Sequence, residues 1–414
     1  MSKRRVVVTG IGCLTPLGNN KEDFWNCLLE GKSGVQTIDF LDTEKLPVKF
    51  SASVKNFESE KYFDRKDLKK MDLFMQYGMA AGIDAVENSG LLNSNIDNNR
   101  IGISIGSGIG GLAMIEATRD TFQKSGSRRI SPFFVPASII NMISGNLSIK
   151  YGFKGPNLSI VTACTTGTHN IGEGFRQIQY AHADAMICGG AEMATSDLGI
   201  GGFAAARALS TRNESPETAS RPWDKDRDGF VLGDGAGVIV LEELEHAKKR
   251  GATIYAEING YGMSADAYHM TLPSETGDGA SRCMTLALED AQLSSDKIDY
   301  INAHGTSTPA GDILELSAVK KTFNSHAHNL IINSSKSMIG HLLGAAGGVE
   351  AIVCILSIIN GRIHQTINID NLDEKCDLNV NHKSAVDCDI NYALSNSFGF
   401  GGTNGSLIFS KFKD

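Results

Sequence analysis

The chain has 414 residues, 41% of them hydrophobic, which suits a folded protein with a large core and excludes a disordered one. A formal net charge of −8 leaves no basic excess for binding nucleic acid or an anionic membrane surface. The eight cysteines form no C-x-x-C pair, and the apolar run after Arg4-Arg5 is too short for a signal peptide. We therefore expect a cytoplasmic protein with reduced thiols.

Short apolar runs, rich in β-branched residues, alternate with longer helical patterns along the whole chain. The runs cover residues 5–10, 100–108, 157–163, 185–192 and 235–242, then 253–262, 299–306, 330–335, 391–397 and 405–412. Continuous apolar strands separated by helices predict a mostly parallel sheet that is covered on both faces. The second series repeats the element order of the first, so we predict two duplicated halves, residues 1–252 and 253–414.

The most apolar stretch of the chain covers residues 342–359. Glycines interrupt it and Glu350 lies near its middle, where a charge in a membrane would be costly. The pattern therefore predicts a buried helix.

Cys164 is the candidate nucleophile. It lies in a turn rich in threonine and glycine, between an apolar run that predicts a buried strand and a helix with Ile171, Phe175 and Ile178 at helical spacing. At the N-terminus of a helix, free backbone N–H groups and the helix dipole favour a thiolate, so we expect a lowered pKa for this thiol. The other seven cysteines are interpreted as buried structural residues.

Two histidines have surroundings that suit partners of a nucleophile. His304 follows an apolar strand in a loop of small polar residues, and His341 opens a helix rich in glycine and alanine. The pattern leaves open whether they are catalytic or structural. Glu350, among apolar residues, needs a partner to offset its burial, and Lys336 is the candidate.

Two rival interpretations are weaker. Residues 106–111 satisfy G-x-G-x-x-G after a strand, but they lie outside the opening strand–turn–helix unit, and no acidic residue ends a second strand about 20 residues later. A cysteine hydrolase could use Cys164 with one histidine, but it would have little use for the second.

Four motifs together resemble the β-ketoacyl-acyl-carrier-protein synthases of thiolase fold, most closely the synthase II type of bacterial fatty-acid synthesis. They are VTACTTG at 161–167, NAHGTST at 302–308, KSMIGHLLGAAG at 336–347 and NSFGFGGTNGS at 396–406, and the likeness runs from residue 7 to the C-terminus. The resemblance implies an α/β fold of five layers, α-β-α-β-α, made from the two halves. It implies decarboxylative condensation of an acyl thioester with malonyl-carrier protein, without a cofactor.

The resemblance also separates this chain from its relatives. A thiolase would need a second cysteine in the loop that here reads Ser397-Phe398-Gly399-Phe400. The initiating synthases have asparagine where this chain has His341, and the silent chain-length factors of polyketide assembly have lost the cysteine. Synthase I and polyketide-type elongating enzymes remain alternatives.

Residue roles follow from the resemblance alone. Cys164 would carry the acyl group, His304 and His341 would donate hydrogen bonds to the malonyl carbonyl oxygen, and both should be uncharged. Lys336 and Glu350 would hold the histidines, and the backbone N–H groups of Cys164 and Phe400 would form the oxyanion hole. Phe400 would also act as gatekeeper. Substrate contacts are expected from Thr306, Thr308, Ile109, Phe203 and Phe398. For Ile109 and Phe203 the sequence pattern fits ordinary core residues equally well.

Partners are likewise expectations. The basic cluster Arg65, Lys66, Lys69 and Lys70, with Arg207 and one of Arg128 or Arg129, would dock an acidic acyl carrier protein. The family implies a homodimer. A monovalent cation near Asn302, Ser395 and Asn396 is a further hypothesis, and no other metal is expected.

Overall fold

Ten strands form one mixed sheet in the computed structural model, which describes residues 3–413. Their order is β10-β9-β13-β14-β8-β1-β7-β6-β4-β5. The bounds are Val6–Leu14 (β1), Ile101–Gly106 (β4), Asn157–Leu158 (β5), Ala185–Glu192 (β6), Gly235–Glu243 (β7), Ala256–Ala265 (β8), Tyr300–Asn302 (β9), Ile331–Asn333 (β10), Tyr392–Gly399 (β13) and Thr403–Ser410 (β14).

The prediction of a mostly parallel sheet is wrong for the centre of this sheet. β4 pairs in parallel with β5 and β6, and β9 with β10 and β13, but β1, β7, β8 and β14 pair antiparallel with their neighbours. Strands buried on both faces have the same continuous apolar pattern whichever way they run, so the sequence could not reveal their direction.

The two halves of the sheet repeat one topology. The order β1-β7-β6-β4-β5 has the same sequence of parallel and antiparallel pairings as β8-β14-β13-β9-β10. The halves join where β1 pairs with β8. This repetition agrees with a duplication, and the boundary between residues 252 and 253, which lies between β7 and β8, stays a prediction.

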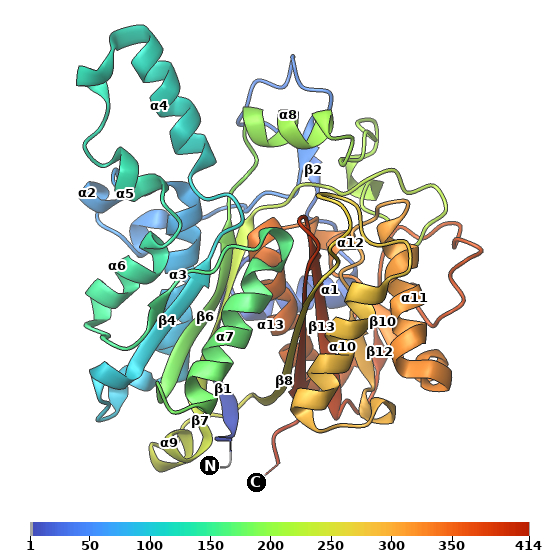
Figure 1. The fold of residues 1–414 in the computed structure, drawn as a ribbon. Coiled ribbons are helices and arrows are strands. Elements are labelled where there is room, and N and C mark those ends of the chain that lie inside the picture. The colour runs from blue at the N-terminus through green and yellow to red at the C-terminus, as the bar shows by residue number, and fades with distance from the viewer. Residues whose placement is uncertain (1–2, 414) are drawn as a thin grey trace.

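Helices complete five layers, α-β-α-β-α, as Figure 1 shows. α3 and α6 pack on the outer face of the first half-sheet, α10 and α11 on the outer face of the second, and α7 and α13 lie between them. The helix bounds are Lys21–Glu30 (α1), Arg65–Leu68 (α2), Leu73–Ser89 (α3), Leu112–Ser125 (α4), Phe134–Ser138 (α5), Met142–Tyr151 (α6), Thr166–Gln179 (α7), Asp197–Ala205 (α8), Leu244–Lys249 (α9), Asp278–Ala291 (α10), Gly311–Phe323 (α11), Lys336–Ile339 (α12) and Ala346–Asn360 (α13).

Two small hairpins lie outside the main sheet: Gln36–Thr37 (β2) pairs with Phe50–Ser51 (β3), and Arg362–Ile363 (β11) with Val386–Asp387 (β12). The segment Leu343–Asn360, which contains α13, is long and apolar enough to cross a membrane, but 89% of it is buried inside the protein. The prediction of a buried core helix is confirmed.

The two central helices touch at a pair of glycines. A Cβ atom added to Gly167 of α7 would lie 2.6 Å from the backbone nitrogen of Gly348, and one added to Gly347 of α13 would lie 2.5 Å from that of Thr168. Only hydrogen at these positions lets the helices approach so closely. Both helices therefore direct their N-termini into one region, where the candidate site lies.

Candidate active site

Cys164 lies in a tight turn at the N-terminus of α7. The turn Ala163–Thr165 (η5) is a 3₁₀ turn, and Ala163 has a φ of 51°, a conformation that costs energy for any residue with a side chain. The Thr166 hydroxyl oxygen accepts the N–H of Thr162 at 2.9 Å, and the Thr165 hydroxyl donates to the Thr403 carbonyl at 2.8 Å. The turn is thus held from both halves of the fold.

The predicted buried strand before Cys164 is wrong in extent and burial. Only Asn157–Leu158 pairs, as β5, and Leu158 and Val161 are 36% and 47% exposed. β5 is an edge strand of the sheet, and no described strand pairs with its outer side.

The predicted lowering of the Cys164 pKa is also wrong. The side chain is 7% exposed, and its burial raises the thiol pKa to about 11. The backbone N–H groups of Phe400 and Cys164 and the charge of Lys336 act in the opposite direction, but they do not outweigh the loss of water. The resting site therefore holds a protonated thiol at neutral pH.

Two neutral imidazoles, arranged edge to face, line the same cavity as this thiol. The ring centroids of His304 and His341 are 5.2 Å apart and the rings are inclined by 87°. Burial, and then the charge of Lys336, lowers the pKa of both well below its ordinary value, which confirms the prediction that both are uncharged.

Backbone contacts fix both histidines. The N–H of Leu343 donates to Nδ1 of His341 at 3.3 Å, so the proton of this neutral ring is on Nε2. The N–H groups of His304 and Gly305 each donate to the Glu315 carboxylate at 2.8 Å. Nδ1 of His304 is buried without a hydrogen-bond partner in the described part of the chain.

Lys336 and Glu350 form the ion pair that the sequence predicted. Both side chains are 1% exposed, and the ammonium donates to one carboxylate oxygen. Burial raises the pKa of Glu350 to about 7 against the lowering effect of Lys336. No hydrogen bond is seen from either side chain to a described histidine, so their holding role stays a prediction.

One cavity of about 420 Å³ brings most of the expected residues together. Its wall includes Cys164, His304, His341, Thr306, Thr308, Phe203, Phe398, Phe400 and Arg207. The hydroxyl oxygens of Thr306 and Thr308 are 3.2 Å apart, and the rings of Phe203 and Phe400 are 6.4 Å apart. The cavity therefore combines a thiol, two imidazoles and an aromatic wall.

The loop that carries Phe400 is tied to a second loop. Gly401 and Gly402 have φ angles of 87° and 68°, which suit glycine, and the Gly401 N–H donates to the Met270 carbonyl at 2.8 Å. The N–H of Asp266 donates in turn to the Gly402 carbonyl at 2.9 Å. Phe400 thus sits on a turn whose glycines permit a change of shape.

Some expected residues lie apart from this cavity. Ile109 is 38% exposed and is absent from the cavity wall, although Phe203 lines it as expected. The basic helix α2 lies beside α5, on the other side of the molecule from α10 and α11, whose N-terminal ends line the cavity (Figure 1). Arg128 and Arg129 are exposed.

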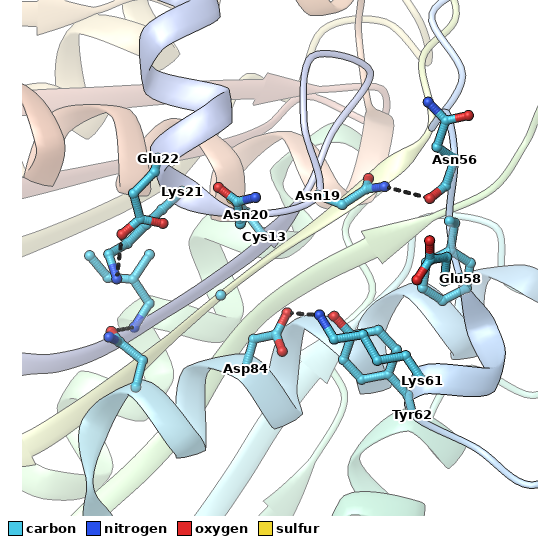
Figure 2. Close-up of a pocket in the computed structure, with 14 residues that line it drawn as sticks. Cys13, Asn19, Asn20, Lys21, Glu22, Asn56, Glu58, Lys61, Tyr62 and Asp84 are labelled. Carbon is cyan, nitrogen blue, oxygen red and sulfur yellow. Dashed lines mark hydrogen bonds and ion pairs between the residues drawn. The ribbon is translucent and has the colours of Figure 1, made fainter.

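A second cavity, of about 320 Å³, contains Cys13 in its wall (Figure 2). Burial raises the pKa of this thiol, and carboxylates and amides, such as Asp84 and Asn19, surround the opening. No histidine lines this cavity. Without a proton-transfer partner, Cys13 does not share the chemistry of Cys164.

Two of the three residues expected to bind a monovalent cation have side-chain oxygens that fit this role. Asn302 Oδ1 and Ser395 Oγ are buried without hydrogen-bond partners among the described residues, as oxygen ligands of a cation would be. Asn396 Oδ1 instead accepts from the Ser406 hydroxyl at 2.7 Å. The described residues contain no group of three or more His, Cys, Asp or Glu side chains that could hold a metal ion. The cation therefore stays a prediction.

Two buried carboxylates at the site were not predicted from the sequence. Glu315 holds the backbone of His304, and Glu192 accepts hydrogen bonds from Ser107, Gly108, Ile109 and Gly344. A carboxylate that ends an apolar strand, as Glu192 does, is the one sequence signal that could have found it.

Comparison with known families identifies this arrangement. The family models for the N-terminal and the C-terminal domain of β-ketoacyl synthase match residues 3–247 and 255–370. The chain belongs to the β-ketoacyl synthase family. The resemblance recognised in the sequence and the thiolase-like α/β fold class are thereby confirmed.

Curated relatives in this family match along the whole chain. The chain is 55% identical to 3-oxoacyl-[acyl-carrier-protein] synthase 2 of Vibrio harveyi over 412 residues, which cover 99% of each protein. It is also 55% identical to the enzyme of the same name from Coxiella burnetii, with all of both chains covered, and 46% identical to that of Synechocystis, with 100% of this chain and 99% of that one covered.

Solved structures of β-ketoacyl synthases share the fold. A type II polyketide ketosynthase in complex with its acyl carrier protein superposes with a TM-score of 0.92 at 35% identity and covers 99% of this chain and 100% of that one. A β-ketoacyl synthase from Burkholderia phymatum gives a TM-score of 0.91 at 35% identity, with the same coverage.

Proposed function

We propose that this β-ketoacyl synthase is an acyltransferase that elongates fatty acids. It condenses an acyl thioester with malonyl-acyl-carrier-protein to give 3-oxoacyl-acyl-carrier-protein, CO₂ and free carrier protein. The observation that carries the proposal is a cysteine at a helix N-terminus that shares one cavity with two neutral histidines, in a chain 55% identical to 3-oxoacyl-[acyl-carrier-protein] synthase 2.

Acyl transfer is the first step. The Cys164 sulfur attacks the carbonyl carbon of the acyl thioester, and the negative oxygen that forms is stabilised by the N–H groups of Cys164 and Phe400. The influence of both N–H groups on the Cys164 thiol supports this placement. When the intermediate collapses, the carbon–sulfur bond to the carrier breaks and the leaving sulfur takes the proton that Cys164 has lost.

Decarboxylation and condensation follow. His304 and His341 donate hydrogen bonds to the malonyl thioester oxygen, where negative charge grows as the bond to CO₂ breaks. The carbanion attacks the acyl carbonyl, a carbon–carbon bond forms, and the Cys164 sulfur leaves as a thiolate, which takes a proton from water to restore the resting thiol. Neutral histidines suit this role, because a cationic pair at a centroid distance of 5.2 Å would repel.

Substrate contacts follow from the cavity wall. Thr306 and Thr308, at its polar side, would hydrogen-bond the carrier's pantetheine arm, and Phe203 and Phe398 would contact the acyl chain. Ile109 lies outside this wall and is 38% exposed, so its contact with the acyl chain stays a prediction from the resemblance.

A homodimer would explain the exposed edge of the sheet. β5 ends the sheet, and Leu158 and Val161, on it and just after it, are exposed. Phe133, Val135 and Ile139, on and around α5, are further exposed apolar side chains. Unpaired edge strands with apolar neighbours are typical of protein interfaces. Sedimentation analysis should find a dimer, and Val161→Lys should shift it toward monomer; a wild-type monomer would refute this arrangement.

Two separate basic sites, Arg207 and the α2 cluster, would dock the acyl carrier protein. Arg207 is exposed at the mouth of the cavity and would meet a carrier that delivers substrate there. The α2 cluster lies on the opposite side of the molecule from α10 and α11, whose ends line that mouth (Figure 1), so it would serve the cavity of the second subunit of a dimer. We also infer a cytoplasmic location, where the carrier and its acyl thioesters are made.

Reconstitution tests the function. Purified protein should convert acyl-carrier-protein and malonyl-carrier-protein to the 3-oxoacyl product, detected by mass spectrometry. Cys164→Gln should abolish condensation and spare malonyl decarboxylation, whereas Cys27→Ala, remote from the cavity, should change neither. Release of products after several successive condensations would indicate a polyketide-type enzyme instead, and absence of any condensation would refute the proposal.

A further inference from the structure

The two halves of the fold each carry the same turn at the N-terminus of a central helix. In η5, Ala163 with a φ of 51° precedes Cys164, and α7 begins two residues later at Thr166. In Leu343–Ala345 (η9), Leu343 with a φ of 47° precedes Gly344, and α13 begins two residues later. Gly344 is therefore the structural counterpart of Cys164.

Different groups face these two turns. The end of β13 contacts η5, and the Phe400 N–H that follows this strand acts on the Cys164 sulfur. The end of β6 contacts η9, and there Glu192 is fully buried with its carboxylate against the N–H of Gly344 at 2.9 Å. In the first half, the space beside the Cys164 N–H is open to a substrate oxyanion. In the second half, the Glu192 carboxylate occupies the equivalent space beside the Gly344 N–H.

The Glu192 carboxylate joins three segments. Besides Gly344 it accepts the N–H groups of Gly108 at 2.7 Å and Ile109 at 3.1 Å, and the Ser107 hydroxyl at 2.6 Å. Gly108 also lies against the nucleophile turn, since a Cβ added there would be 3.4 Å from the Ala163 carbonyl oxygen. Through these contacts Glu192 reaches the neighbours of both Cys164 and His341.

We propose that Glu192 is a positioning residue, whose carboxylate fills the anion site of the second half and so holds the His341 turn in register with the Cys164 turn. Gly344 directly follows Leu343, whose N–H fixes Nδ1 of His341 and so the proton on Nε2. A shift of η9 would therefore displace the Nε2–H donor of His341. It would affect the acylation of Cys164 much less. This inference rests on the proposed function.

Only an ionised carboxylate accepts from all four donors without conflict. A glutamine would turn its own NH₂ group toward at least one N–H, because an amide has a single oxygen. Misplacing a catalytic group by about 1 Å can cost about 100-fold in rate. Glu192→Gln should therefore slow malonyl decarboxylation and condensation by about 100-fold, and acyl transfer to Cys164 by less than about 10-fold.

The experiment measures these partial reactions separately. Acyl-Cys164 formation is followed by intact-protein mass spectrometry, CO₂ release by radiolabel, and folding by thermal denaturation. Glu116→Gln is the matched control: its carboxylate also accepts a hydroxyl and a backbone N–H, from Ser196 and Leu198, but no hydrogen bond among the described residues joins it to η5 or η9. This variant should leave the ratio of the malonyl decarboxylation rate to the Cys164 acylation rate unchanged.

Ser107→Ala removes one donor only and provides a second variant should Glu192→Gln fail to fold. It should lower the same ratio by a smaller factor, about 5-fold, in a folded protein. A ratio equal to wild type in the folded variants would overturn the inference while leaving the proposed function intact. A wild-type protein inactive in both reactions would instead overturn the proposed function.

Discussion

The imidazole of His341 meets that of His304 at 87°, with 5.2 Å between the ring centroids. The two rings come from separate loops, one after β9 and one before α13, and both are neutral because of their burial. Two neutral imidazoles in the wall of one cavity that also contains Cys164 suit stabilisation of a single oxygen anion.

Replacement of His341 should slow malonyl decarboxylation far more than acylation of Cys164. His341→Ala removes one donor to the developing enolate, so malonyl decarboxylation should fall by about 10²–10³-fold, or about 2.7–4 kcal/mol. Acylation of Cys164 should stay within several-fold of wild type, because that oxyanion is bound by backbone N–H groups. Radiolabelled CO₂ release and intact mass measure the two steps. Equal loss of both would instead make His341 the base that deprotonates Cys164.

The reactivity of Cys164 should depend steeply on pH. Burial raises its pKa to about 11, so the thiolate fraction and the rate of alkylation by iodoacetamide should rise about tenfold per pH unit between pH 7 and 9. Mass spectrometry of the labelled peptide measures the rate, and Cys164→Ala identifies the signal. A plateau below pH 8 would show a low-pKa thiolate, as the helix position alone predicts.

The chemistry-bearing residues could be predicted from the sequence because each stands next to its own local signal. Cys164 precedes a helical pattern, and His304 follows an apolar strand. Glu350 lies inside an apolar helix and needs a partner of opposite charge, for which Lys336 is the candidate. The direction of the central strands could not be predicted, because burial on both faces erases the alternation that would reveal it.

Other features depend on contacts between distant segments. Glu192 reaches Gly344 across 152 residues, and the burial that raises the Cys164 pKa comes from surrounding elements rather than from its own helix. Ile109 has the apolar character of a tunnel residue, but its loop lies at the surface of one chain. Sequence pattern carries no information on such tertiary placement.

Loss of Lys336 should destabilise the protein in a pH-dependent way. Lys336→Met leaves Glu350 buried without its partner, at a cost of about 3–5 kcal/mol in the free energy of unfolding. The pKa of Glu350, about 7 with Lys336 present, should rise further, so the folded variant binds a proton that the unfolded chain releases. Its stability should therefore fall as pH rises from 6 to 8. Urea unfolding at both pH values measures this, and an equal cost at each would contradict it.

The same variant should alter the histidines. The charge of Lys336 lowers the pKa of both His304 and His341, so its removal should raise both. Because the neutral rings are the active form, the acid limb of the pH–rate profile should move to higher pH. Lys320→Met, at an exposed pair with Asp377, is the control and should leave the profile in place.

Charge reversal on α2 should weaken capture of the carrier protein only. With Arg65, Lys66 and Lys69 changed to Glu, the Michaelis constant for acyl-carrier-protein should rise about tenfold at low salt, because steering by opposite charge is lost. The rate with a small acyl thioester should not change. Wild-type protein should show a Michaelis constant that increases with salt, and the variant a flat one. Lys411→Glu, on the exposed C-terminal segment, should behave as wild type; an unchanged constant in the α2 variant would remove this helix from docking.

Gly347 should tolerate no side chain. A Cβ atom there would lie 2.2 Å from the Thr168 hydroxyl oxygen and 2.5 Å from the Thr168 backbone nitrogen, so α7 and α13 would have to separate. Overpacking of this kind costs about 1–3 kcal/mol, and more where backbone is the obstacle. Gly347→Ala should therefore lower the free energy of unfolding by at least that amount, measured by urea denaturation.

Gly145→Ala is the matched control for this substitution. Gly145 lies inside α6, and its added Cβ would meet no atom closer than 3.8 Å. Because alanine favours a helix interior over glycine by about 0.5–1 kcal/mol, this variant should be slightly more stable than wild type. The two turns that hold Cys164 and Gly344 begin the helices that meet at Gly347. Gly347→Ala should therefore also slow both acyl transfer and condensation. Wild-type stability and rates in Gly347→Ala would mean that the helices do not meet as closely as described.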